Sequence, residues 1–288
     1  MSRPRPEPRD LLALTKPGIL RMCLITTAGG MLMAPGTVTV RLVLATFVGT
    51  GLAVAGANAF NMWLERDTDR HMRRTCRRPL PTGRLDPNTA VRFAALLSLL
   101  SFPVLAIGAN LLTAVLALLA IVGYVCVYTP LKYRSPLALV IGAVPGAAPP
   151  LLGWTAVSGS LDPGGLVLFG ILLVWQMPHF IAIALMRKAE YARAGIKTVP
   201  NVRGDAIAKI QAVAWALALV PLSLMLTPLG VAGFTYFCCA FVLGMVYASW
   251  GFTGLDSKAG PTWARRYFFA SLVYLPALMG SLALDAFL

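Results

Sequence analysis

The chain has 288 residues, of which 58% are hydrophobic and only 12% are charged. A soluble domain of this size carries about 25% charged residues, so the composition excludes an ordinary soluble enzyme. The formal net charge of +14 would suggest nucleic-acid binding in a soluble protein. Here the basic residues gather between apolar runs, which is typical of membrane topology, and no nucleic-acid partner is expected.

The chain begins with a basic, proline-rich segment, residues 1–16, which lacks a short apolar core followed by a small-residue cleavage site. It is therefore interpreted as a retained cytoplasmic segment and not as a signal peptide. Beyond it, apolar runs of about 18 or more residues recur, each able to cross a bilayer core of roughly 30 Å. The expected spans are 18–35, 42–60, 91–108, 111–128, 137–157, 166–186, 210–227, 229–252 and 267–288.

These runs predict an all-α, polytopic membrane protein forming a single domain over residues 1–288. About nine transmembrane helices are expected around a central cavity. Lysine and arginine concentrate in the segments that are cytoplasmic if the N-terminus is cytoplasmic, whereas the outer loops hold only Arg41. The distribution therefore predicts a cytoplasmic N-terminus, an outer C-terminus and a cytoplasmic cap of two long polar loops, 61–90 and 187–209.

The loop after the second span contains three regularly spaced polar residues, Asn61, Glu65 and Asp69. If the helix continues, the i, i+4, i+8 spacing places them on one face. Two carboxylates so close destabilise a helix by roughly 0.2–0.5 kcal/mol, which indicates a cation between them. Oxygen ligands without His or Cys favour Mg²⁺, which also binds substrate phosphates. The alternative is an acidic face neutralised by neighbouring arginines in a solvated loop.

The loop after the sixth span holds one carboxylate, Glu190, among basic residues that include Arg187 and Lys188. Such a cluster suits a diphosphate, which carries two to three negative charges. The alternative is that these residues reflect only the positive-inside rule.

The sixth span carries Trp175, Pro178 and His179 at membrane depth. Ionisable residues there usually face the protein interior or a cavity, and Trp175 four residues before His179 suggests a flat aromatic substrate. His179 could equally be a buried structural residue. In the fifth span, three prolines and two glycines at 142–150 are expected to interrupt the helix and to form one wall of an internal chamber.

Together, polar loops above an apolar chamber fit a substrate with a diphosphate head and a lipid tail. Burying a farnesyl tail at about 0.8 kcal/mol per carbon contributes on the order of 10 kcal/mol. The tail therefore belongs in the membrane.

The segments NMWLERDTD at 61–69, MRRTCRRPLPTG at 72–83, GAAPPLLGW at 146–154 and WQMPHF at 175–180 resemble the protoheme IX farnesyltransferases (heme O synthases). These belong to the UbiA-type intramembrane aromatic prenyltransferases. The resemblance runs from about Thr15 to Gly204 and is consistent with the remaining spans. Glu65 stands where the superfamily usually has Asp, and Glu190 is the single carboxylate of the second motif, which puts a symmetric two-metal site in doubt.

The resemblance implies that Mg²⁺, held by Asn61, Glu65 and Asp69 with Glu190 as a further ligand, binds farnesyl diphosphate. It also implies transfer of the farnesyl group to a vinyl group of protoheme IX (heme B), a substrate and not a prosthetic group, giving heme O. Trp175 and His179 are the expected heme contacts. The expected diphosphate-binding residues are Arg73, Lys132, Arg134, Arg187 and Lys188.

A related enzyme acting on a quinone precursor or another aromatic ring is the main alternative, and it should lack the pattern at 175–180. A transporter predicts polar residues spread through the membrane midplane, and a purely structural subunit leaves Glu65 and Asp69 unexplained. The expected location is the bacterial cytoplasmic (inner) membrane. Membrane lipid is an expected partner, and heme A synthase or a terminal oxidase assembly are the candidate protein partners.

Overall fold

The computed structural model describes residues 7–256 and 258–285, and all regular secondary structure in these residues is helical. Arg3 and Arg5 of the predicted N-terminal segment lie outside the described residues, as do positions 286–288 of the last predicted span. The elements in chain order are α1 (Pro8–Leu14), α2 (Pro17–Met33), α3 (Val40–Leu64), α4 (Arg66–Asp69), α5 (Pro87–Gly108), α6 (Leu111–Val122), π-helix η1 (Gly123–Tyr128), α7 (Thr129–Leu131), α8 (Ala138–Ser158), α9 (Pro163–Met186), α10 (Lys188–Arg193), α11 (Val199–Arg203), α12 (Asp205–Leu224), α13 (Phe234–Phe252), 3₁₀-helix η2 (Thr253–Leu255) and α14 (Pro261–Asp285).

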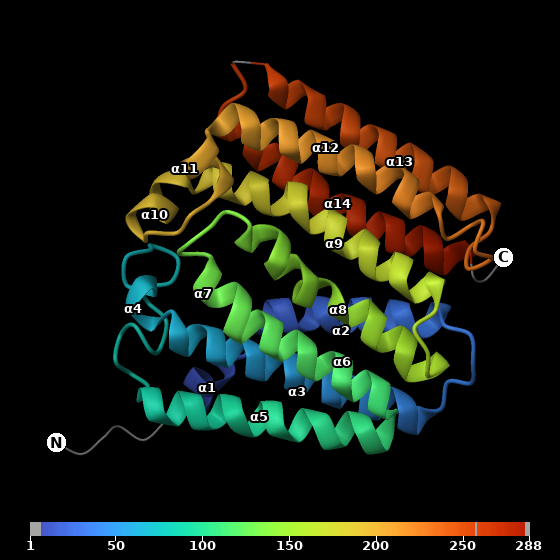
Figure 1. The fold of residues 1–288 in the computed structure, drawn as a ribbon, viewed down its shortest axis with the longest axis horizontal. Helices are drawn as coiled ribbons and strands as arrows, with labels where there is room; N and C mark the ends of the chain where they lie inside the picture. The colour runs from blue at the N-terminus through green and yellow to red at the C-terminus, as the bar shows by residue number, and fades with distance from the viewer. Residues whose placement is uncertain (1–6, 257, 286–288) are drawn as a thin grey trace.

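Eight helical segments of the described chain are long and apolar enough to cross a membrane. A ninth is added if α1 and α2, which meet at 53°, count as one bent span. The prediction of an all-α multi-span membrane protein is therefore confirmed. Figure 1 shows the long helices side by side, with α8 and α9 in the middle, α3 and α5 on one side, and α12 and α13 on the other.

Small residues allow the central helices to approach closely. A Cβ atom on Gly30 of α2 would lie 2.0 Å from the Pro150 carbonyl oxygen of α8, and one on Gly153 of α8 would lie 2.0 Å from the Thr27 carbonyl oxygen of α2. Because apolar burial gives little driving force between helices in lipid, such backbone-to-backbone contact is a main source of helix association. Helices α2 and α8 are therefore in close backbone contact beside the centre of the molecule.

Helix α8 corrects one expectation. The sequence predicts an interrupted helix, but residues 138–158 form one continuous helix despite Pro145, Pro149 and Pro150. A proline frees the carbonyl four residues before it, and close packing against neighbouring helices tolerates this inside a membrane. Most of the second half of α8 is buried against α2 and α9, so packing holds the helix together. The same helix does line an internal cavity, as expected.

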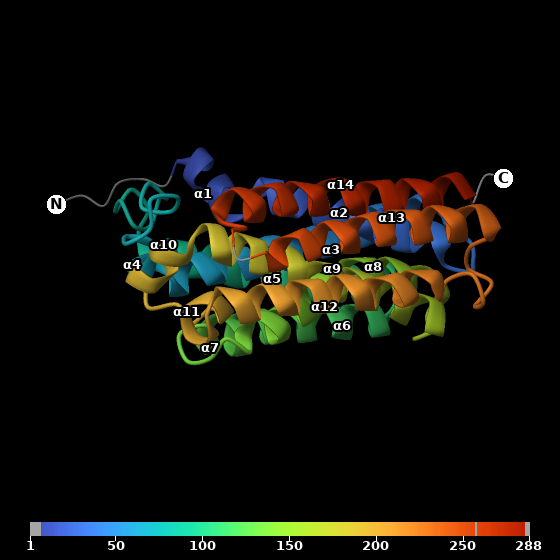
Figure 2. The same ribbon diagram turned by 90° about the horizontal axis from the view of Figure 1, so that it is seen from above.

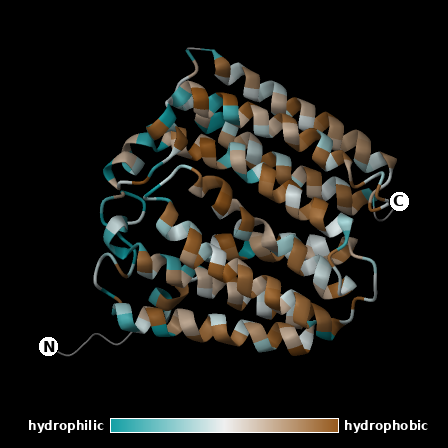
Figure 3. Ribbon diagram, in the orientation of Figure 1, coloured by the Kyte–Doolittle hydropathy of each residue, from teal (hydrophilic) through white to brown (hydrophobic). Residues whose placement is uncertain are grey.

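The two polar loops meet at one end of the molecule. In Figures 1 and 2, α1, α4, α7, α10 and α11 gather at the end where the N-terminus lies, whereas the C-terminus lies at the other end. Figure 3 shows that hydrophilic residues concentrate at this same end. Met72 of the first loop packs with Ala194 and Ile196 of the second, and the Lys197 amide donates to the Lys132 carbonyl at 2.8 Å. The predicted cap therefore forms a single structure.

Candidate active site

A cavity of about 1570 Å³, including its open mouth, lies directly beneath the cap. Its walls come from α2, the α3–α4 junction, η1, α8, α9 and the segment leading into α11. Asn61, Glu65, Asp69 and Lys132, all predicted for the site, line it. The structure therefore brings the first predicted motif and one predicted cation together from segments far apart in the chain.

The helix carrying the first motif breaks at Glu65 without losing its register. Helix α3 ends at Leu64, and α4 begins at Arg66. The Glu65 amide still donates to the Asn61 carbonyl at 3.0 Å, and the Asp69 amide donates to the Glu65 carbonyl at 2.8 Å. These two i to i+4 bonds keep Asn61, Glu65 and Asp69 on the cavity side, as their spacing predicts.

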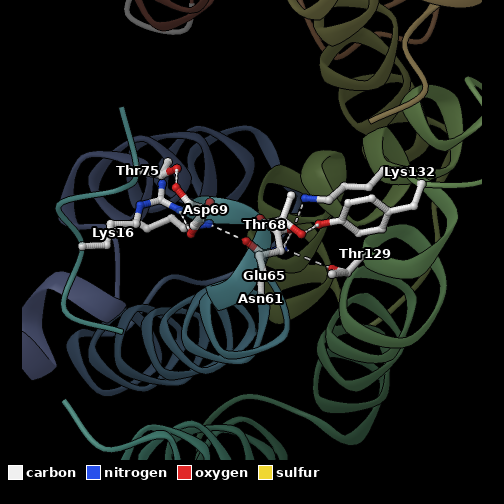
Figure 4. A network of polar contacts seen from close by, with 10 residues as sticks. Lys16, Asn61, Glu65, Thr68, Asp69, Thr75, Thr129 and Lys132 are labelled. Atoms are coloured by element: carbon white, nitrogen blue, oxygen red, sulfur yellow. Dashed lines mark hydrogen bonds and ion pairs between the residues drawn. The ribbon is translucent and has the colours of Figure 1, made fainter. Parts of the chain in front are cut away.

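Glu65 is held between an amide and an ammonium group. Asn61 Nδ2 and Lys132 Nζ both donate to Glu65 Oε1, as Figure 4 shows. Lys16 Nζ, from the bend between α1 and α2, donates to Asn61 Oδ1 at 2.7 Å. Glu65, Asn61 and Lys132 are buried, and a buried carboxylate requires such partners.

Asp69 is fully buried and only half satisfied. Arg78 Nη1 lies 2.7 Å from Asp69 Oδ2, and Thr75 Oγ1 donates to the Asp69 carbonyl at 2.9 Å. Asp69 Oδ1 has no hydrogen-bond partner among the described residues. Such an orphaned buried oxygen is costly unless a ligand or ion completes it.

The donor set fits Mg²⁺. Glu65 and the orphaned Asp69 oxygen are hard oxygen ligands, and Asn61 Oδ1, which accepts from Lys16 Nζ, is a third oxygen beside them. Across residues 7–256 and 258–285, no group of three or more His, Cys, Asp or Glu side chains is placed to hold a metal. A cation here would therefore take its remaining ligands from substrate phosphate and water, which is the usual behaviour of Mg²⁺.

Lys16 and Arg78 belong to the cavity but are not among the residues predicted for it. Lys16 has a φ of 51° and is the one described non-glycine residue with positive φ. Such a conformation costs about 1 kcal/mol or more and persists where the surroundings impose it. Burial of the ammonium group, opposed by the charge of Glu65, lowers the pKa of Lys16 to about 8. The bend therefore places a cation in the site at an energetic cost, which indicates function.

The π-helix η1 connects the polar motif to two tyrosines. Thr129 Oγ1 donates to the Tyr124 carbonyl at 2.8 Å, and Asn61 Nδ2 donates to Thr129 Oγ1 at 3.2 Å. Tyr124 and Tyr128 line the cavity, and their ring centroids are 5.2 Å apart. π-Helical turns occur frequently at functional sites. Nothing in the sequence distinguishes these tyrosines from the aromatic residues of other spans.

A smaller apolar slot of about 550 Å³, including its open side, adjoins the cavity among the long apolar helices. Ile19, Cys23, Tyr124 and Gly146 line both spaces, so the two are neighbours that share a wall. The slot lies between α2, α3, α6 and α8, and alanine is the most frequent residue of its wall. Its shape and chemistry suit a flexible hydrocarbon chain.

Five other predicted residues lie outside the cavity wall: Arg73, Arg134, Arg187, Lys188 and Glu190. Arg73 and Arg134 are exposed. Arg187 and Glu190 pair with each other at 3.4 Å, and Lys188 pairs with Asp205 at 2.7 Å. The structure therefore gives no support to diphosphate or metal binding by these five residues. The second polar loop, 187–209, supplies the cavity with Lys197 and Thr198 instead.

Trp175 and His179 also face away from the cavity. Their rings stack at 4.8 Å. Trp175 Nε1 donates to the Ser271 carbonyl of α14 at 2.9 Å, and His179 Nδ1 lies 2.7 Å from Ser271 Oγ. The cavity face of α9 carries Gln176 and Phe180, so direct heme contact by the two predicted residues is not supported.

Residues 23–273 match the UbiA prenyltransferase family, and the chain belongs to this family. The fold agrees. A structure of digeranylgeranylglyceryl phosphate synthase superposes with a TM-score of 0.83 at 17% identity, covering 96% of this chain and 98% of that one. A UbiA homologue from Archaeoglobus fulgidus bound to DMAPP and Mg²⁺ gives a TM-score of 0.67 at 16% identity, with 95% and 99% covered.

Curated relatives narrow the assignment within the family. The protoheme IX farnesyltransferase of Myxococcus xanthus (strain DK1622) is 48% identical over 276 residues, which covers 96% of this chain and 94% of the relative. That of Aquifex aeolicus (strain VF5) is 39% identical, with 96% and 95% covered. Within the UbiA family, the chain therefore groups with the protoheme IX farnesyltransferases, as the sequence motifs predict.

Proposed function

We propose that this protein transfers the farnesyl group of farnesyl diphosphate to a vinyl group of protoheme IX, giving heme O. The observation that carries the proposal is the position of the polar motif. Glu65, Lys132 and the orphaned oxygen of Asp69 line the cavity that adjoins the apolar slot. The names of the relatives favour a porphyrin acceptor over a quinone precursor.

The diphosphate is proposed to bind in this polar part of the cavity, between the first motif and the cations around it. Asn61, Glu65 and Asp69 would hold Mg²⁺, which supplies charge stabilisation to the departing phosphate oxygens. Lys132, Lys16 and Arg78 already contact these three residues. They are therefore placed to neutralise charge that develops as the bond breaks, where preorganised donors are most effective.

The farnesyl tail is proposed to occupy the alanine-lined slot. Burial of its carbons at about 0.8 kcal/mol each stabilises the bound tail. When the bond between C1 and the diphosphate oxygen breaks, the electron pair leaves with diphosphate and an allylic cation remains. Tyr124 lies where cavity and slot meet, and an aromatic face stabilises a nearby cation.

The porphyrin is proposed to enter the wider part of the cavity, between α8 and α9. Gly142, Phe180 and Ala184 line this part. The vinyl group attacks the allylic cation, and water adds to the resulting carbocation with loss of a proton, which completes the hydroxyethylfarnesyl group. Trp175 and His179, bonded to Ser271 on the opposite side, would set the position of the α9 face from behind.

We further infer that the protein lies in the bacterial cytoplasmic membrane with its cap and N-terminus in the cytoplasm. The cap holds the basic loops that the positive-inside rule assigns to that side. The whole chain is proposed to act as one domain, because the cavity walls extend from α2 to α11. Heme A synthase or a terminal oxidase assembly is proposed to receive the product.

The proposed reaction is tested by incubating purified protein with farnesyl diphosphate, Mg²⁺ and protoheme. Mass spectrometry should detect a heme that has gained one farnesyl group and one hydroxyl group. A parallel incubation offers 4-hydroxybenzoate as the acceptor. Prenylation of 4-hydroxybenzoate without any heme product would contradict the proposal in favour of a quinone-precursor enzyme.

A further inference from the structure

Two cationic residues of the cavity remain outside the polar network. Among the described residues, Lys16 binds Asn61, Arg78 pairs with Asp69 and Lys132 pairs with Glu65. Arg74 and Lys197 also line the cavity, but no carboxylate of the described chain lies within ion-pair distance of either. The mechanism proposed above uses neither residue.

Arg74 and Lys197 belong to the part of the cap where the two loops meet. Met72, two residues before Arg74, packs on Ala194 and Ile196 of the second loop. Arg74 also lies near Tyr191 of that loop. Burial raises the pKa of Tyr191, and the charge of Arg74 acts in the opposite direction. Both cations are exposed and therefore lie at the aqueous rim of the cavity.

A polar side chain without a partner stands beside Lys197. Thr198 lines the cavity, and its Oγ1 is buried with no hydrogen-bond partner among the described residues. A buried hydroxyl normally has a partner, so an unsatisfied one is a candidate ligand contact. Below this rim, the α9 wall is largely apolar, with Phe180, Ile183 and Ala184, and Gln176 is its polar residue. A ligand bound here would need an anionic edge at the rim and an apolar body beneath it.

We propose that Arg74 and Lys197, assisted by Thr198, bind the two propionate carboxylates of the porphyrin acceptor. This inference rests on the proposed function. Two carboxylates on one edge of the porphyrin match two unpaired cations, and carboxylates are too costly to bury deep in a membrane. The vinyl groups occupy the porphyrin edge opposite the propionates. Holding the propionates at the rim therefore directs the vinyl groups into the cavity, toward Tyr124 and the slot.

The test compares protoheme with its dimethyl ester, which keeps the ring and the vinyl groups but lacks both negative charges. Binding to the full chain in detergent is measured by absorbance titration. Each charge-assisted hydrogen bond contributes at least about tenfold in affinity, so wild type should bind the ester at least about tenfold more weakly. Arg74→Gln and Lys197→Gln should each weaken protoheme binding by about tenfold and leave ester binding within about twofold.

Arg77→Gln and Arg193→Gln are matched controls, because both residues are exposed on the same loops and neither lines the cavity. They should bind acid and ester as wild type does. Binding of farnesyl thiodiphosphate with Mg²⁺, a slowly ionising analogue, should be unchanged in all four variants.

Four outcomes would overturn the inference. If Arg74→Gln and Lys197→Gln weaken the binding of protoheme and of its ester equally, the effect is one of packing. If these variants lose affinity for farnesyl thiodiphosphate, the two cations belong to the diphosphate site. Wild type that binds acid and ester equally while still forming farnesylated heme would exclude a propionate subsite and leave the proposed function intact. Wild type that binds neither and forms no product would reject both proposals.

Discussion

Lys132 and Glu65, which are 67 residues apart in the sequence, form a buried ion pair in the wall of the cavity. Lys132 follows the π-helical span, and Glu65 sits at the break between α3 and α4. The pair therefore joins the α3–α4 junction, which carries the proposed metal ligands, to the segment that follows η1, which carries the tyrosines proposed to stabilise the allylic cation.

The first prediction concerns this pair. Lys132→Met leaves the Glu65 carboxylate buried without its cation, which costs about 3–5 kcal/mol. The variant should unfold at a lower temperature and lose turnover. Adding Glu65→Gln removes the uncompensated charge, so the double variant should regain much of the lost thermal stability but no activity. Thermal unfolding in detergent and product formation measure the two effects. A double variant as unstable as Lys132→Met would show that the pair is not coupled.

The second prediction concerns Asp69. Asp69→Asn keeps the shape of the side chain and an oxygen for Arg78, but it removes the negative charge next to the orphaned Oδ1 position. The variant should remain folded and should need a Mg²⁺ concentration at least about tenfold higher for half-maximal activity, because Mg²⁺ depends on anionic oxygen ligands. Titration of Mg²⁺ into EDTA-stripped protein gives the comparison. A folded Asp69→Asn variant with wild-type Mg²⁺ dependence would falsify the metal role.

The third prediction concerns the apolar slot. Ala117 of α6 lines the slot and is buried, so Ala117→Leu should fill part of it. Adding methylene groups to a packed apolar site costs roughly 1–3 kcal/mol of free energy, and the farnesyl tail would have to pack against the larger side chain. The KM for farnesyl diphosphate should rise at least about tenfold, since 1.4 kcal/mol is a tenfold change in affinity, whereas geranyl diphosphate should be affected less. Ala218→Leu, at an exposed position of α12, is the control and should change neither KM. Equal losses for both substrates would place the tail elsewhere.

The fourth prediction concerns His179. Because its ring contacts Trp175, Phe268 and Ser271 and does not line the cavity, His179→Gln should act on stability. Loss of a buried hydrogen bond costs about 1–3 kcal/mol, so the unfolding temperature should fall. Protoheme and diphosphate affinities of the folded fraction should stay within about twofold of wild type. Ser271→Ala should produce a similar loss of stability. Selective loss of protoheme binding in His179→Gln would instead restore the direct heme contact that the sequence suggests.

The fifth prediction concerns orientation in the membrane. The cap and the described C-terminal end of α14 lie at opposite ends of the molecule (Figure 1). If the cap is cytoplasmic, alkaline phosphatase fused to the C-terminus should be active, and a cytoplasmic reporter fused there should be silent. The reverse pattern would invert the proposed topology.

Several features of this protein follow from the sequence alone because they depend only on local properties. A run of apolar residues long enough to cross a bilayer predicts a span wherever it occurs, and all of the expected spans correspond to helices of the structure. The i, i+4 spacing similarly places Asn61, Glu65 and Asp69 on one side, since the backbone hydrogen bonds survive the break at Glu65. Long motifs identify the family, because they combine many positions.

The partners of these residues were decided by tertiary structure. Lys16 and Lys132 come from segments 45 and 67 residues away from the residues they bind, and no local pattern encodes such pairings. Within one loop, Arg78 reaches Asp69 whereas Arg73 is exposed. These two residues have the same chemistry, so only the irregular path of the loop distinguishes them.

Helix α9 is a second case, inside the membrane, in which the sequence does not determine what each side chain contacts. In a soluble protein, polarity marks the face of a helix that is exposed to water, but lipid and protein interior are both apolar. The sequence therefore shows that Trp175, Gln176 and His179 avoid lipid without showing what each faces. Packing against α14 engages Trp175 and His179 through Ser271 and leaves Gln176 on the cavity side. The rotation of α9 about its own axis thus decides which of its residues line the cavity proposed to hold the acceptor, and this rotation depends on contacts between helices.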